Sequence, residues 1–148
     1  MPTRITHFLH HNPITGSQVL GTSFTTGNVH VHDLHDGVAP LIAAKKNFFG
    51  IVDSIQVVLT NLGGVGGPPS KVTIRLCEDA AGDIVIVPDT EADIVTGLTT
   101  NTTGNAVFKV GTIIRQDLGG PGNGTLYLFV KVDTGTATFA GSECFWQE

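Results

Sequence analysis

The chain has 148 residues, of which 41% are hydrophobic and only 14% charged, and its formal net charge is −5. This length suits one domain with its own core and is too short for two typical domains. The negative net charge argues against a nucleic-acid-binding surface, which needs clustered Lys and Arg. No apolar run is long enough to span a membrane. We therefore expect neither nucleic acid nor a membrane as a partner. Because residues 1–16 lack the apolar core of a secretory signal, we also expect no Sec-type export.

The N-terminal part of the chain differs in composition and hydrophobic pattern from the rest. Residues 1–46 hold all six histidines, and residues 1–16 show no clean hydrophobic period. This predicts an N-terminal arm over 1–16 that becomes ordered against a neighbouring subunit, followed by a β-domain over 17–148. Near the end of this part, the run LIAAKK (41–46) favours one or two helical turns.

Apolar runs of strand length, rich in β-branched and aromatic residues, follow one another along the rest of the chain. Gly, Pro, Asn or Asp separates them, as is typical of turns. The predicted strands are 17–24, 28–35, 54–60, 71–76, 83–87, 105–114, 125–132 and 136–146. Their spacing predicts an all-β fold: an antiparallel β-sandwich, jelly-roll-like, of about eight strands.

Alternation within the strands predicts one buried and one outer face. In 126–132 the aliphatic residues alternate with Tyr127, Phe129 and Lys131, which therefore fall on the outer face. Aromatic side chains on an outer face favour a subunit contact, so these three residues are interface candidates. The alternative is that a loop or the N-terminal segment of the same chain covers them.

His30 and His32 lie two apart in a predicted strand and share one face, with His35 just beyond. A His-x-His pair with a third histidine can hold a divalent metal, as in cupin-type jelly rolls. Asp33 points to the opposite face, however, and no histidine follows His35 to complete the site from another strand. Surface or interface histidines are the favoured interpretation, a metal site at His30 and His32 is the alternative, and no cofactor is expected.

Asp89, Glu91 and Asp93 alternate in PDTEADI, a spacing that resembles the start of a calcium loop. No glycine follows at the required turn, so solvated carboxylates are favoured over a loop Ca²⁺ site completed by Asp79 or Asp83.

No motif predicts an enzyme. GGVGGPPSK lacks the Gly-Lys-Ser/Thr order of a phosphate loop, and there is no G-x-S-x-G nucleophile turn. A paired-carboxylate glycosidase stays open on sequence alone, although a chain of this size leaves little room for a cleft. Cys77 and Cys144 are expected to be two buried thiols rather than a disulfide, since no export signal accompanies them.

The stretch KVTIRLCEDAAGDIVIVPDTEADIV with GTLYLFVKVDTGTATFAGSECFWQE resembles small β-sandwich virion proteins of tailed bacteriophages, such as capsid decoration (cement) and auxiliary proteins. The resemblance lies in the pattern of strands and turns over about two thirds of the chain and includes no diagnostic motif. It implies a non-enzymatic virion protein, made in the host cytoplasm, that binds the major capsid protein or other virion proteins and stabilises the shell, often as a homotrimer. Repeated sites on a shell give avidity, so each contact can be modest.

Two other functions remain as alternatives. A carbohydrate-binding module of an adhesin or fibre would present Trp146, Tyr127 or Phe129 as an exposed platform for sugar rings, whereas the virion interpretation has these aromatics buried. A metal-dependent cupin-like enzyme would need metal held by His30 and His32.

Overall fold

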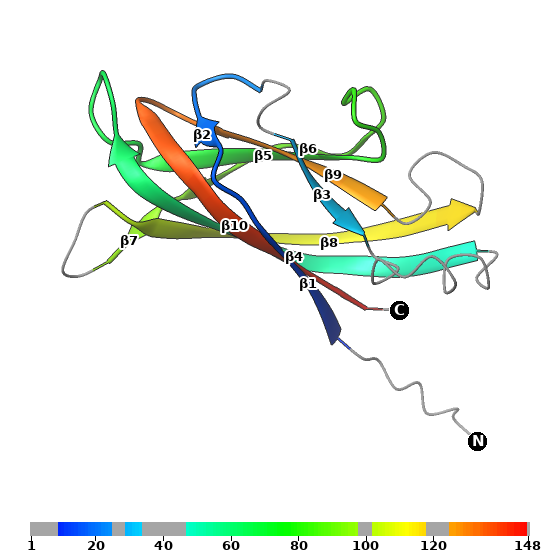
Figure 1. The fold of residues 1–148 in the computed structure, drawn as a ribbon. Coiled ribbons are helices and arrows are strands. Elements are labelled where there is room, and N and C mark those ends of the chain that lie inside the picture. Colours follow the sequence, from blue (N-terminus) through cyan, green and yellow to red (C-terminus); the bar gives the residue numbers. More distant parts are fainter. Residues whose placement is uncertain (1–8, 25–28, 34–46, 98–101, 118–124, 148) are drawn as a thin grey trace.

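The computed structural model describes residues 9–24, 29–33, 47–97, 102–117 and 125–147, and shows an antiparallel β-sandwich (Figure 1). The strands are β1 (Leu9–Thr15), β2 (Val19–Leu20), β3 (Val29–Asp33), β4 (Asn47–Gly63), β5 (Lys71–Cys77), β6 (Val85–Asp93), β7 (Val95–Thr96), β8 (Gly104–Asp117), β9 (Thr125–Val132) and β10 (Thr136–Gln147). The larger sheet has the order β1-β10-β4-β8-β7, with β2 also paired to β10, and the smaller sheet has the order β3-β9-β5-β6.

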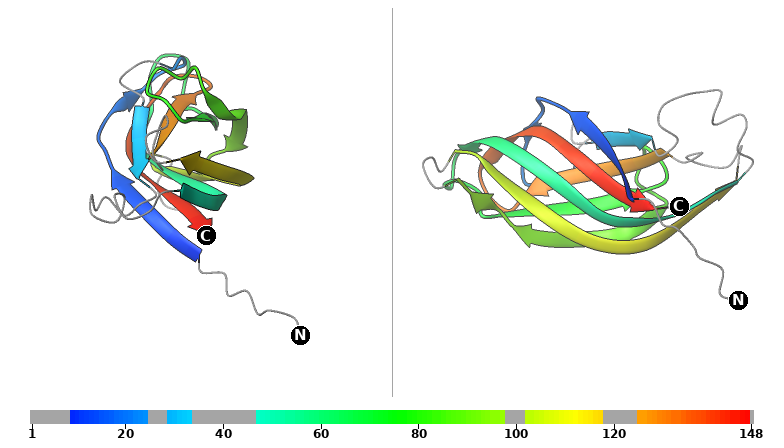
Figure 2. Two further views of the ribbon diagram at one scale, coloured as in Figure 1. Left: turned by 90° about the vertical axis from the view of Figure 1, so that its right-hand side faces the viewer. Right: turned by 90° about the horizontal axis from the view of Figure 1, so that it is seen from below.

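The strand order is that of a jelly roll. If β1 and β2 count together as the first strand, because both pair with β10, and the two-residue β7 is left aside, eight strands remain. The first then pairs with the last, and β3 with β9, β4 with β8 and β5 with β6. This is the pairing of one long antiparallel hairpin rolled into two layers. The predicted all-β sandwich is confirmed, and the two layers wrap around a common core in the views of Figure 2.

The core lies between the sheets, where the predicted alternation placed it. Inward-facing residues of β4, β5 and β9 have no exposed surface or almost none: Ile55, Val57, Leu59, Val72, Ile74, Leu76, Leu126, Leu128, Val130 and Val132. From β10, Phe139 is the largest fully buried side chain. An alternating face of this kind can be buried only by a second layer, which is why the chain forms a sandwich.

Two segments without predicted strands are strands in the structure. Residues 9–15 of the predicted arm form β1, which pairs with β10 over seven register positions, and the acidic segment after Pro88 continues β6. Each contains a proline, Pro13 or Pro88, and each is the outer strand of its sheet. An edge strand tolerates proline because one side of its backbone has no strand partner. The division into an arm at 1–16 and a domain at 17–148 stays a prediction, and residues 41–46 lie outside the described part.

The β4–β5 turn packs against the β9–β10 turn. Asp133 Oδ1 accepts hydrogen bonds from the backbone nitrogens of Ser70 (3.0 Å) and Lys71 (3.1 Å), and Oδ2 accepts one from Ser70 Oγ (2.8 Å). Gly135 has a φ of 63°, and a Cβ there would collide with the carbonyl oxygens of Gly63 and Gly67. Only glycine fits such an approach, so the two turns form one fixed corner of the sandwich.

Candidate interaction surfaces

Strand register aligns residues in rows across the outer face of the larger sheet. One row contains one residue from each of β1, β10, β4, β8 and β7: Thr15, Gly141, Val58, Asn105 and Val95. The next row contains Pro13, Glu143, Gln56 and Val107. Because directly opposed residues of antiparallel strands share a face, these rows form one surface.

Valines stand exposed on this surface. Val58, Val107 and Val95 expose 40%, 54% and 65% of their area, and Val19 on β2 exposes 67%. Of the seven large hydrophobic residues exposed in the described part of the chain, four therefore belong to this one sheet face. The adjacent valines Val57 and Val58 were a sequence signal for it, since apolar residues on both sides of a strand indicate burial on both faces.

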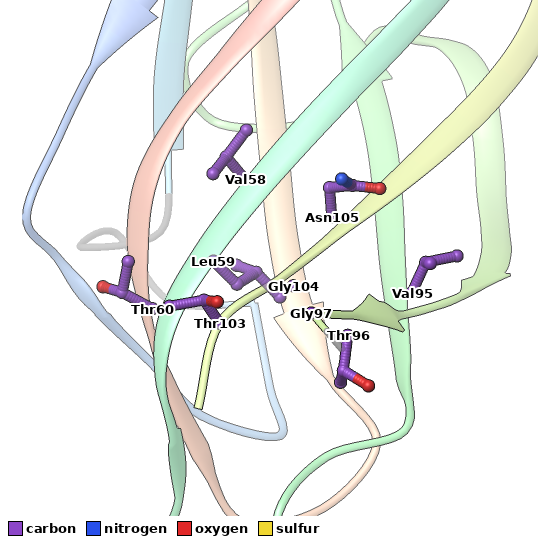
Figure 3. A pocket seen from close by; sticks show the side chains of 9 residues that line it. All are labelled: Val58, Leu59, Thr60, Val95, Thr96, Gly97, Thr103, Gly104 and Asn105. Atoms are coloured by element: carbon purple, nitrogen blue, oxygen red, sulfur yellow. The ribbon is translucent and has the colours of Figure 1, made fainter. Parts of the chain in front are cut away.

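Two hollows lie on the same face and share Val58 as a wall. The larger has a volume of about 340 Å³ and the smaller about 220 Å³. We call the larger the β7 hollow; Figure 3 shows its lining, with Val58, Asn105 and Val95 contributed by β4, β8 and β7. Its complete lining is Val58, Leu59, Thr60, Val95, Thr96, Gly97, Thr103, Gly104 and Asn105.

Charge is nearly absent from these hollows. The β7 hollow has no charged residue in its lining, and the smaller hollow has only Glu143. A partner that covers these hollows would displace water mainly from valines, threonines and amides, and not from charged side chains. Removing water from unpaired ions is costly. The linings of the two hollows therefore hold little of the charge that would oppose contact with another protein.

The three interface candidates of β9 lie on the outer face of the smaller sheet. Tyr127 and Lys131 are half-buried, whereas Phe129 is only 7% exposed. Phe24, from the segment between β2 and β3, packs edge-to-face on Phe129 with ring centroids 6.1 Å apart. The N-terminal segment thus covers Phe129, which is the alternative that the sequence left open. A subunit contact through these residues stays a prediction.

Phe24 also lies between two cations. The guanidinium carbon of Arg75 and the ammonium nitrogen of Lys131 are each 4.8 Å from the centre of its ring. Both cations interact with the negative face of the π-system. We call Phe24, Arg75, Phe129 and Lys131 the Phe24 cluster. Sequence reasoning missed Phe24, because no local pattern links it to Arg75, Phe129 and Lys131, which lie more than fifty positions later in the chain.

Two of the three acidic residues of β6, Asp89 and Glu91, form cross-strand ion pairs with β5. Arg75 Nε lies 2.7 Å from Asp89 Oδ1, and Lys71 Nζ lies 3.7 Å from Glu91 Oε1. The hydrogen bond that Arg75 Nε donates to the Asp89 carboxylate is the largest cause of the raised pKa of Arg75. Asp79 instead caps the β5–β6 turn, where it accepts hydrogen bonds from the backbone nitrogens of Ile84 and Asp83 that lower its pKa. In the described part of the chain, no three His, Cys, Asp or Glu side chains come together as a metal site.

His30 and His32 belong to β3, where they pair with Leu128 and Leu126 of β9. Their side chains, and the whole of His35, lie outside the described residues. Metal binding at His30 and His32 therefore stays a prediction.

Both cysteines are buried free thiols, as predicted. Burial raises the pKa of Cys144 to about 12 and also raises the pKa of Cys77. A thiol that resists ionisation is a poor nucleophile and a poor metal ligand. The described residues also include no helix long and apolar enough to cross a membrane.

No protein-family model matches the chain, and a search of curated proteins found no match. Among solved structures, a virus-like particle of the giant freshwater prawn Macrobrachium rosenbergii nodavirus is similar at a TM-score of 0.47 and 8% identity, over 97% of this chain and 92% of that one. The decameric BFDV capsid protein is similar at 0.42 and 9%, over 96% and 99%. The catalytic unit of a Streptomyces thermodiastaticus α-1,3-glucanase gives 0.42 and 9%, over 90% of this chain and 25% of the enzyme.

Proposed function

We propose that this chain is a structural protein of a virus particle, and more specifically a capsid decoration (cement) protein of a tailed bacteriophage. Its partner would be the major capsid protein of an assembled shell, and it would act as a homo-oligomer, with the trimer implied by the sequence resemblance. The observation that carries the proposal is the outer face of the larger sheet, where four exposed valines lie beside two hollows whose linings contain one charged residue, Glu143.

A rigid support makes this face suitable for docking. The face is formed by long hydrogen-bonded strands above a fully buried core, so little conformational freedom is lost when a partner covers it. A shell repeats its binding sites many times, and an oligomer that engages several of them gains avidity from contacts that are individually weak.

The carbohydrate-binding alternative has less support, because most of the aromatic side chains it needs are buried. Trp146 is 3% exposed and Phe129 7% exposed, so neither offers a ring face to a sugar. Of the three aromatics that the sequence offered as a platform, only the half-buried Tyr127 remains.

Co-sedimentation with shells tests the proposal. The probe is the undecorated capsid, assembled from the major capsid protein of the phage that encodes the chain. We expect the wild type to pellet with the capsid to saturation, and Val107→Lys to bind at least tenfold more weakly because it places a charge in the centre of the face. Val85→Lys, which changes a valine of similar exposure on β6, is the matched control.

Absence of wild-type binding, or an equal loss in both variants, would overturn the decoration role. A glycan array run in parallel decides the alternative: binding that Tyr127→Ala abolishes would assign the chain to the carbohydrate-binding class.

A further inference from the structure

One exposed hydrophobic side chain stands apart from the sheet face. Val65 is 98% exposed at the tip of the β4–β5 turn, in the sequence GGVGGPPS. A free valine on a mobile loop would be unremarkable, since isolated apolar residues are common on protein surfaces. This turn, however, is held firmly.

Three glycines fix the shape of the turn. Gly64, Gly66 and Gly67 have φ values of 93°, 97° and 92°, and the nitrogen of Gly67 donates to the carbonyl oxygen of Gly64 at 3.2 Å. A Cβ on Gly64 would come within 2.8 Å of the backbone nitrogen of Thr136 in the opposing turn. The turn is therefore pressed onto its neighbour, and Val65 projects from it as a pre-formed knob. A pre-formed contact loses less entropy on binding than a flexible one.

The β7 hollow has the properties of a receptor for such a knob. Its volume of about 340 Å³ lies at the lower end of the range for small-ligand pockets, which is room for a valine and its flanking glycine backbone. The exposed aliphatic side chains of its wall are those of Val58 and Val95, whereas the side chain of Leu59 is buried in the core. Neither the hollow nor the turn from Gly63 to Ser70 carries a charge, so joining them strips water from no ion.

Knob and hollow lie at the same end of the sandwich, as Figure 1 shows for the β4–β5 turn and β7. Val65 exposes almost all of its surface, so it does not fill the hollow of its own molecule. A second copy of the chain supplies both complementary parts.

We propose that Val65 of one copy inserts into the β7 hollow of a second copy, and that this contact joins the subunits of a homo-oligomer. A reciprocal pair of such contacts closes a two-fold dimer, whereas a head-to-tail arrangement closes a ring such as a trimer. The contact involves little area, which makes a solution oligomer weak. The inference does not depend on the virion role, because it concerns only copies of this chain.

Sedimentation velocity over a concentration series up to about 1 mM tests the contact. We expect the wild type to associate, and Val65→Asp and Val95→Asp each to raise the dissociation constant at least tenfold, equivalent to about 1.4 kcal/mol. Val107→Asp is the matched control, because Val107 lies on the same sheet face but does not line the hollow. Circular dichroism and melting temperature establish that each variant is folded.

Mixing the two impaired variants provides the sharper test. The intact knob of Val95→Asp can still enter the intact hollow of Val65→Asp, so the mixture should form a heterodimer that neither variant forms alone. A wild type that stays monomeric throughout the series would overturn the proposal. So would a mixture without heterodimer, or a Val107→Asp variant that dissociates as much as Val65→Asp. The Val107→Lys shell assay fails or succeeds independently of these outcomes.

Discussion

Replacing Phe24 by alanine removes the part of the cover over Phe129 that the N-terminal segment supplies, while the turn at Gly82 still lies against the Phe129 ring. The substitution measures what the Phe24 cluster contributes to stability. The edge-to-face pair with Phe129 is worth about 0.5–1.5 kcal/mol, and a partly exposed cation–π contact about 0.5–1 kcal/mol. Two such contacts are present, through Arg75 and Lys131, but Arg75 is also held by Asp89 and the three interactions are not independent. We therefore expect Phe24→Ala to lower the free energy of unfolding by about 2 kcal/mol.

Urea denaturation followed by far-UV circular dichroism measures this change, and in a chain of this length it corresponds to a fall in Tm of about 4–8 °C. Val19→Ala, which truncates an exposed residue of the same N-terminal segment, is the control and should stay within about 0.5 kcal/mol. A double-mutant cycle with Lys131→Ala should give a coupling energy of about 0.5–1 kcal/mol. If Phe24→Ala is as stable as the wild type, the segment does not hold Phe129 as described, and the outer face of β9 is open to a subunit instead.

Three further predictions follow from single contacts. Gly135→Ala should lower the free energy of unfolding by about 1–3 kcal/mol, because the added Cβ would meet backbone carbonyl oxygens at a residue with positive φ. Gly21→Ala, where a Cβ has open space, is the control. Similar urea unfolding midpoints for the two variants would contradict the argument. Burial tends to raise the pKa of Asp133, but its hydrogen bonds from Lys71 and Ser70 outweigh this and the pKa is lowered. The carboxylate therefore stabilises the fold fully above its unfolded pKa of about 3.9, and this contribution is lost as the pH falls through the folded value. The urea unfolding midpoints at pH 7 and pH 3 should differ less for Asp133→Asn than for the wild type. Equal differences would mean that Asp133 does not contribute to the loss of stability in acid. Cys144, with its pKa raised to about 12, should react with a thiol reagent at pH 8 only after unfolding, and rapid labelling of the native protein would show that the core opens readily.

The sequence by itself determined the fold class of this protein. Alternation in β4, β5 and β9 fixes which side chains face inward, because successive residues of a strand point to opposite sides whatever the strand pairs with. The prediction of two buried thiols rested on the usual burial of free cysteine and on the lack of an export signal, and the structure confirms it. Turn residues marked most strand boundaries, because their backbone preferences act over only a few positions.

Only the tertiary structure decided which strands pair and which distant side chains come into contact. Strands β1 and β6 accommodate Pro13 and Pro88 because the topology makes both of them edge strands. Two carboxylates of β6 form ion pairs because of its register with β5. Phe24 covers Phe129 although 105 positions separate them, a contact that no local pattern encodes. The valine rows of the larger sheet likewise exist because register aligns β10, β4, β8 and β7. Local preferences choose strands, but only the closing of the whole sandwich decides which strands are neighbours, and the surfaces proposed for contact arise from that choice.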